Sequence, residues 1–129
     1  MPPQTPTPTP AELAILRVLW QRGPSTVREI HDALKDERAT GLSTTLKFVQ
    51  LMTEKGLVLK EDSGRPQVFR SSQSQERTQT RLLDELIQRA FGGSASNLVL
   101  RAVAARRISP KELAEIKKLI ESSRKEHKS

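Results

Sequence analysis

The 129 residues have room for one ordinary domain or two very small ones, and their formal net charge is +7 with an isoelectric point near 10.3. The chain has no cysteine and two histidines, His31 and His127, which excludes disulfides and cysteine nucleophiles and argues against a metal centre. No apolar run could span a bilayer and no secretory signal is present, so we expect a cytoplasmic protein without membrane insertion. We expect no cofactor. The basic charge favours a polyanionic partner such as nucleic acid or an acidic membrane surface.

The first predicted element is a helix that begins after Thr9. Residues 1–8 contain proline alternating with polar residues and have nothing to bury, so we expect them to form a disordered tail. Thr9 and Glu12 have the spacing of a capping box around a proline at the first helical position. A broad apolar stripe follows through Trp20, and Gly23 is expected to end the helix.

A second helix is predicted after Thr26. Thr26 and Glu29 form another capping box, and apolar residues at helical spacing continue to Leu34. His31 is expected on the polar face of this helix. Residues 35–41 are charged or small and are expected to form a connection.

The stretch 42–56 predicts a helix with two different faces. One face has the apolar spacing of a buried stripe. The opposite face has hydroxyls, an amide and a cation, which is the chemistry that meets phosphates and base edges in a DNA major groove. An ordinary amphipathic surface helix would show the same stripe, so this stretch alone leaves both interpretations open. The buried stripe is predicted at Thr45, Phe48, Val49 and Met52, and the DNA contacts at Ser43, Thr44, Lys47 and Gln50.

Two short apolar runs after this helix, residues 57–60 and 67–70, predict a two-stranded hairpin. An isolated hairpin is marginal in water, so it must lie against the helices. Three helices followed by a hairpin is the element order of a winged helix-turn-helix domain, with residues 61–66 as the wing. Arg65 is placed at its tip, where it is free to reach a phosphate or a minor groove, and a solvated turn arginine fits the sequence equally well.

The polar residues 71–75 predict a boundary between a winged-helix domain over residues 9–72 and an all-α domain over residues 73–129. We expect three helices in the second domain, one starting at Glu76, one over residues 94–107 and one starting after a third capping box, formed by Ser109 and Glu112. Their apolar faces exceed what one small unit can bury, so two copies should pair as a symmetric homodimer. The predicted dimerisation residues are Leu82, Leu83, Leu86, Ile87, Phe91, Leu98, Val99, Val103, Leu113, Ile116, Leu119 and Ile120.

Several short motifs follow one another at characteristic spacings. They include Val18-Leu19-Trp20, Gly23-Pro24-Ser25-Thr26-Val27-Arg28-Glu29-Ile30, Ser43-Thr44-Thr45-Leu46-Lys47 and Glu54-Lys55-Gly56-Leu57-Val58. In this order the chain resembles the penicillinase repressors, the BlaI/MecI/CopY family of bacterial transcriptional regulators, from about residue 9 to about residue 126. The resemblance implies a winged-helix domain, a three-helix dimerisation domain and a homodimeric repressor on an inverted-repeat operator.

The resemblance also implies where regulation would act. In well-known members a membrane sensor protease cuts an Asn-Phe bond in the helix that matches residues 98–104. The matching pair here is Arg101 and Ala102, which makes it the cleavage position by analogy and the protease a further partner. Copper-responsive members have carboxy-terminal cysteine motifs, and this chain has no cysteine.

We therefore predict a homodimeric, sequence-specific transcriptional repressor that binds a double-stranded DNA operator and is relieved by proteolysis or another signal. Leu46 either touches a thymine methyl group or packs inward. The alternative is a winged-helix module for protein–protein assembly, which steep salt dependence and preference for one DNA sequence would separate from a repressor. The chain lacks the cysteine, clustered histidines, phosphate-binding glycine loop and paired carboxylates expected of an enzyme.

Overall fold

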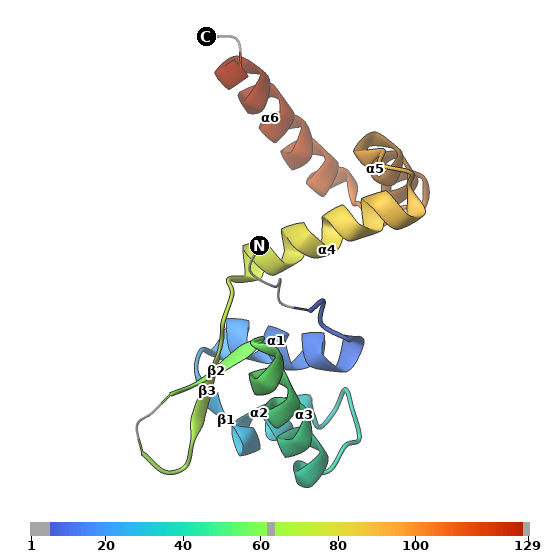
Figure 1. The fold of residues 1–129 in the computed structure, drawn as a ribbon. Coiled ribbons are helices and arrows are strands. Elements are labelled where there is room, and N and C mark those ends of the chain that lie inside the picture. The colour runs from blue at the N-terminus through green and yellow to red at the C-terminus, as the bar shows by residue number, and fades with distance from the viewer. Residues whose placement is uncertain (1–5, 62–63, 128–129) are drawn as a thin grey trace. The chain divides into compact units, whose positions relative to one another are not determined.

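The computed structural model describes residues 6–61 and 64–127. The predicted tail lies partly outside the described residues, as do two positions of the predicted wing. The described elements are six helices and a three-stranded antiparallel sheet (Figure 1). This confirms the mostly α fold class, with a winged helix-turn-helix followed by an all-α region. In chain order the elements are α1 (Pro10–Arg22), β1 (Ser25–Thr26), α2 (Val27–Leu34), α3 (Leu42–Lys55), β2 (Val58–Glu61), β3 (Val68–Ser71), α4 (Gln75–Ala90), α5 (Ala95–Ala104) and α6 (Pro110–His127).

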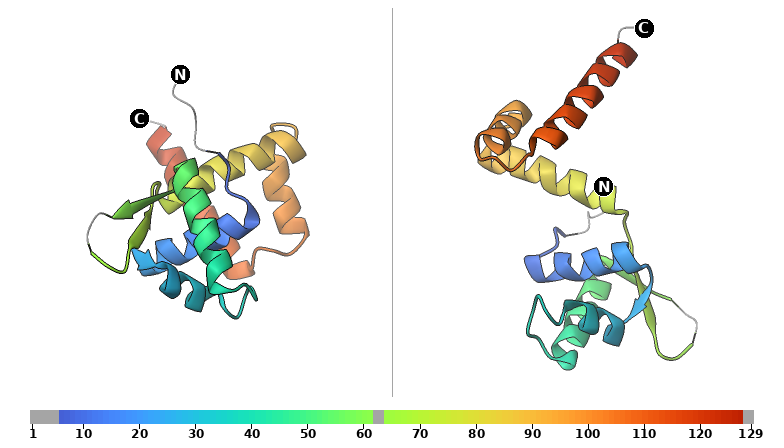
Figure 2. Two further views of the ribbon diagram at one scale, coloured as in Figure 1. Left: turned by 60° about the horizontal axis from the view of Figure 1, so that its bottom comes forward. Right: turned by 180° about the vertical axis from the view of Figure 1, so that it is seen from behind.

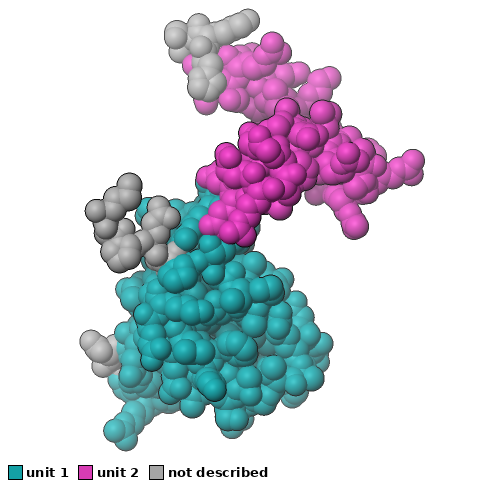
Figure 3. Space-filling model, turned by 45° about the vertical axis from the view of Figure 1, so that its right-hand side comes forward, with its two compact units in different colours: residues 1–82 teal, residues 83–129 magenta. Residues whose placement is uncertain are grey.

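The chain forms two compact units, which Figure 3 colours separately. Unit 1 comprises residues 1–82 and unit 2 residues 83–129. Helix α4 runs through residue 82, so its first half belongs to unit 1 and its second half to unit 2. The domain limits expected from the sequence, 9–72 and 73–129, stay predictions.

Helices α1 and α2 start where their capping residues place them. Thr9 Oγ1 accepts the backbone N–H of Glu12 at 3.2 Å, and the Glu12 carboxylate accepts the Thr9 N–H at 2.9 Å. Thr26 and Glu29 repeat this reciprocal pair at 3.1 and 2.9 Å. Each pair satisfies two N–H groups that a helix start leaves without intrahelical acceptors. Both starts follow from the sequence alone.

The sheet of unit 1 has one more strand than the sequence predicts. Strands β2 and β3 form the expected hairpin, and β1 pairs with the other edge of β3, giving the order β1-β3-β2. Ser25 lies opposite Phe69, and Thr26 lies opposite Val68. The predicted hairpin is therefore present, and β1 is a third strand that the sequence did not predict. A strand of two residues has no alternating pattern, and its pairing depends on β3, which lies far along the chain.

The core of unit 1 is formed by α1, α2, α3 and the hairpin. Ile30, Val49, Met52 and Val58 are completely buried. The predicted stripe of α3 faces this core, because Thr45 is also buried and Phe48 packs against the buried cluster. The buried apolar residues are Ala14, Ile15, Leu16, Val18, Leu19, Ile30, Leu34, Val49, Met52, Leu57, Val58 and Phe69.

A buried carboxylate joins the start of α1 to the end of α3. The Glu12 side chain is 3% exposed, and its Oε2 lies 2.8 Å from Lys55 Nζ. Burial alone would raise the pKa of Glu12, but hydrogen bonds from Lys55 and Thr9 together with the charge of Lys55 lower it below its ordinary value. The sequence indicated only the capping role of Glu12, because Lys55 is 43 residues away.

The segment that leads from β3 into α4 is fastened to unit 1. Trp20 Nε1 donates to Ser71 Oγ at 3.0 Å and to the Gln73 carbonyl at 3.2 Å. Ser72 Oγ donates to the Gly56 carbonyl at 2.6 Å. These bonds join the segment to α1 and to the end of α3, so its serines act as hydrogen-bonding groups of unit 1.

Unit 2 consists of the second half of α4 with α5 and α6. The predicted third capping box is present, since Ser109 Oγ accepts the Glu112 N–H at 3.1 Å and Glu112 accepts the Ser109 N–H at 2.9 Å. The helix expected over residues 94–107 ends earlier, at Ala104, and Arg106 takes a left-handed backbone conformation with φ of 57°. No residue of 83–126 is buried, although many are apolar.

Candidate nucleic-acid interface

Helix α3 is held by the core on one face and exposed on the other. Its amino terminus follows Gly41, and no side chain caps it. Its carboxyl end is closed by Gly56, whose left-handed conformation (φ 80°) favours glycine, and whose N–H bonds the Met52 and Thr53 carbonyls. The uncapped N–H groups of the first turn are donors that suit an anion such as a phosphate.

The structure places all four predicted DNA contacts of α3 on its exposed surface. Ser43, Lys47 and Gln50 recur at the spacing of one row along the helix, since each turn takes about 3.6 residues. Glu54 extends the same row. Thr44 is also exposed but lies about 100° around the helix axis from Ser43.

The hairpin brings a second set of polar groups beside α3. Figures 1 and 2 show that the hairpin β2–β3 extends away from the three helices of unit 1. Arg65 is exposed in the loop between its strands. It therefore occupies the wing position expected from the sequence.

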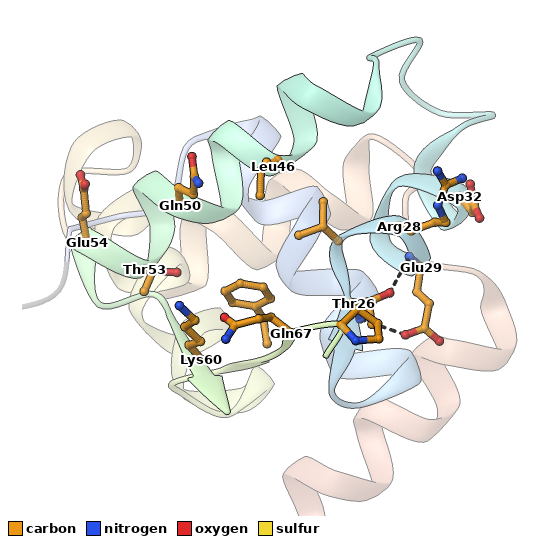
Figure 4. Close-up of a pocket in the computed structure, with 13 residues that line it drawn as sticks. Thr26, Arg28, Glu29, Asp32, Leu46, Gln50, Thr53, Glu54, Lys60 and Gln67 are labelled. Carbon is orange, nitrogen blue, oxygen red and sulfur yellow. Dashed lines mark hydrogen bonds between the residues drawn. The ribbon is translucent and has the colours of Figure 1, made fainter. Parts of the chain in front are cut away.

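A groove of about 990 Å³ lies between α2, α3 and the hairpin (Figure 4). Gln50 and Leu46 face it from α3, while Lys60 and Gln67 face it from the hairpin. Its lining residues are Thr26, Val27, Arg28, Glu29, Asp32, Leu46, Gln50, Thr53, Glu54, Lys60, Pro66, Gln67 and Phe69.

Two cations of this groove, Arg28 and Lys60, were not among the predicted contacts. Among the described residues neither forms an ion pair with an acidic side chain. Glu29, next to Arg28, is engaged elsewhere: its carboxylate accepts the Thr26 N–H and pairs with Arg22 at 3.2 Å. Hydrogen bonds from Thr26 and the nearby charge of Arg22 lower the pKa of Glu29. Arg28 and Lys60 are thus left available to phosphate.

The sequence contains a partial signal for these two residues. Arg28 is the second residue of α2 and follows a recognisable cap, and Lys60 is a polar position in a short strand. Their shared groove depends on how the hairpin packs against the helices, which spacing along the chain does not show.

His31 is half-buried on α2, and both of its ring nitrogens have a polar partner. Its Nε2 is 3.1 Å from the Thr40 carbonyl and its Nδ1 is 3.3 Å from the Asp32 carboxylate. The carbonyl can only accept, so Nε2 must be the donor in that bond. This bond joins α2 to the residues just before α3 and helps to set where α3 begins.

A model of the penicillinase repressor family matches residues 8–122. The chain belongs to the penicillinase repressor family. A search of the curated proteins found no match. Family membership makes the chain a DNA-binding transcriptional repressor, and the family consists of regulators rather than enzymes.

The DNA contacts proposed for this repressor stay predictions, although their surroundings are now clear. Ser43, Lys47 and Gln50 share one face of a helix fixed in a folded core, and Arg65 projects from the wing. Within the described residues, no helix is long and apolar enough to cross a membrane. The same residues contain no group of three or more side chains that could hold a metal ion.

The predicted dimerisation residues also stay predictions. Most of them are exposed, up to 69% at Leu119, and the others are half-buried. Leu82 belongs to unit 1, where it lines a small pocket together with Leu57 and Thr78. The remaining eleven lie in unit 2.

The proposed cleavage position lies within a helix. Arg101 is exposed and Ala102 is half-buried, and both are inside α5. A protease needs an extended substrate, so a cut at this bond would require α5 to open locally.

Proposed function

We propose that this penicillinase repressor binds an inverted-repeat operator as a homodimer, with one α3 helix in the major groove of each half-site. The main support is the exposed row formed by Ser43, Lys47 and Gln50 on a helix whose other face is anchored in the core. A hydroxyl, a cation and an amide in one row suit the donors and acceptors of base edges and phosphates. Two such helices would reach successive major grooves about 34 Å apart.

Contacts to the DNA backbone would hold α3 in register. Arg65, which is exposed in the loop of the wing, would reach a phosphate or the minor groove. Arg28 and Lys60 would contact phosphates on either side of the groove that flanks α3. Residues 1–70 hold 10 Lys and Arg against 8 Asp and Glu. The position of these cations near α3 therefore matters more than the small net charge.

The homodimer is supported by the state of unit 2. A helical unit in which none of residues 83–126 is buried has too little apolar burial to be stable alone. A second copy offers the same apolar faces, and a twofold axis lets each copy cover the other. Pairing also joins two weak half-site contacts into one specific complex.

Repression would follow from occupation of promoter DNA in the cytoplasm. Relief requires a signal that weakens the dimer or its DNA contacts. Cleavage by a sensor protease at Arg101–Ala102 would do so by separating α6 from the rest of unit 2. Because this pair differs from Asn-Phe, such a protease would need a different specificity.

The row on α3 is tested by the double variant Lys47→Ala with Gln50→Ala in the full chain. The probe is a DNA duplex that the wild type has enriched from a random pool. Loss of one phosphate and one base contact should lower affinity at least tenfold, measured by gel shift at fixed salt. The control is Lys35→Ala with Gln21→Ala, which removes the same side-chain types from exposed positions outside α3. Unchanged affinity in a folded double variant would contradict the assignment of α3.

A further inference from the structure

Leu46 is an apolar side chain on the exposed side of α3. It is 41% exposed, whereas Val49 and Met52 on the same helix are completely buried. The sequence allowed Leu46 to pack inward or to face a ligand, and the structure rules out inward packing. A leucine this exposed gives up stabilisation of the fold, since burying such a side chain is worth about 1.5–3 kcal/mol.

Leu46 lies next to the polar row of α3. It is about 40° around the helix axis from Gln50 and about 60° from Ser43, at 3.6 residues per turn. Figure 4 shows Leu46 and Gln50 along the same helix, above the groove that the hairpin borders. Val27 of α2 and Phe69 of β3 line the same groove and give it further apolar surface. An apolar group therefore stands beside a predicted base-reading amide.

The major-groove edge of DNA has one apolar feature, the C5 methyl group of thymine. We infer that Leu46 determines specificity by contacting a thymine methyl in each half-site, beside the base that Gln50 reads. This inference rests on the proposed DNA-binding role of α3. It adds a requirement on the operator: the operator has a thymine at one symmetric position of each half-site, and the repressor recognises the methyl group of that thymine.

The size of the effect follows from the burial of one methyl group. Burial of a group of this size changes affinity about fourfold at one half-site. Removing the methyl at both symmetric positions should then cost about fifteenfold, if the two sites act independently.

The experiment replaces thymine by deoxyuridine, which lacks the methyl group and keeps the base-pairing atoms. The full-length wild type first enriches a duplex from a random pool. The two thymines at each symmetric position of that duplex are then replaced by deoxyuridine, one position at a time. The affinity for each duplex is measured at fixed salt for three proteins. They are the wild type, Leu46→Ala and the control Leu51→Ala, whose leucine is also 41% exposed on α3 but lies outside the groove.

We expect one symmetric position at which deoxyuridine weakens the wild type and Leu51→Ala about fifteenfold. At that position Leu46→Ala should bind thymine and deoxyuridine equally well. The inference is wrong if no position shows this coupling while the wild type still prefers its selected sequence. If the pool yields no enriched sequence, the proposed function fails and this inference falls with it. Circular dichroism checks that both variants are folded. The effect of deoxyuridine on the wild type is measured without any substitution in the protein.

Discussion

The two units of this repressor are both largely helical, yet they differ in how far their apolar side chains are buried. Unit 1 buries side chains from three helices and the hairpin in one core, whereas residues 83–126 of unit 2 have no buried side chain. Both units have apolar helix faces in the sequence, and those of the second exceed what one small unit can bury. The comparison teaches that a stripe predicts a face to be covered without saying whether the same chain covers it.

The reason lies in what each unit can place opposite its helices. In unit 1 the hairpin closes the core, since Val58 and Phe69 are buried against the helices. Unit 2 has no described strand, and its helices leave Leu100 at 66% and Leu119 at 69% exposure. The missing cover is what a second copy would supply.

The largest expected effect is on unit 2. Leu86→Asp puts a charge where we expect a dry interface, and the charge occurs twice in a dimer, so the dissociation constant should rise at least a thousandfold. Sedimentation at micromolar concentration would then show monomers. Leu51→Asp, which replaces a leucine of similar exposure in unit 1, should leave the dimer intact. If the Leu86→Asp protein remained a dimer of wild-type affinity, the idea that a second copy covers the apolar faces of unit 2 would be wrong.

A core cavity in unit 1 should have the next largest effect. Ile30 is completely buried, so Ile30→Ala should lower the free energy of unfolding by about 2–5 kcal/mol. Trp20, the only tryptophan, lies in unit 1 and reports its unfolding by fluorescence in urea. Ile120→Ala removes the same side chain where it is 54% exposed in unit 2, and should leave the Trp20 transition nearly unchanged. Equal shifts in the two variants would show that the units unfold together.

A smaller effect, dependent on pH, is expected at the buried ion pair. Glu12→Gln keeps the shape of the side chain and removes its charge, so it should cost about 1–3 kcal/mol at neutral pH. Because the pKa of Glu12 is lowered in the folded chain, its contribution is present above the unfolded value of about 4.5 and is lost as the pH falls through the folded value. The difference between variant and wild type should therefore shrink below about pH 4.5.

The matched control for this pair is Glu37→Gln. Its partner Arg17 is 3.3 Å away, but both side chains are more than half exposed, so the change should stay within about 1 kcal/mol. Urea unfolding curves at several pH values measure both variants. A constant difference between Glu12→Gln and wild type down to pH 3 would show that the carboxylate does not titrate with folding.

Local features were predictable because their causes are close together in the sequence. Thr9, Thr26 and Ser109 were each predicted to form a capping box with the glutamate three residues later, and all three boxes form. The buried face of α3 and the hairpin followed from spacing alone. Family motifs extended the prediction to a repressor, which the match over residues 8–122 supports.

What the sequence alone determined was the order of elements, the faces to be covered and the polar row of α3. Tertiary structure decided which groups meet across the chain: Glu12 with Lys55, β1 with β3, and the groove that Leu46 and Lys60 share. The physical reason is distance along the chain. Capping and helical periodicity act within a few residues, whereas burial, strand pairing and ion pairing depend on segments brought together only by folding.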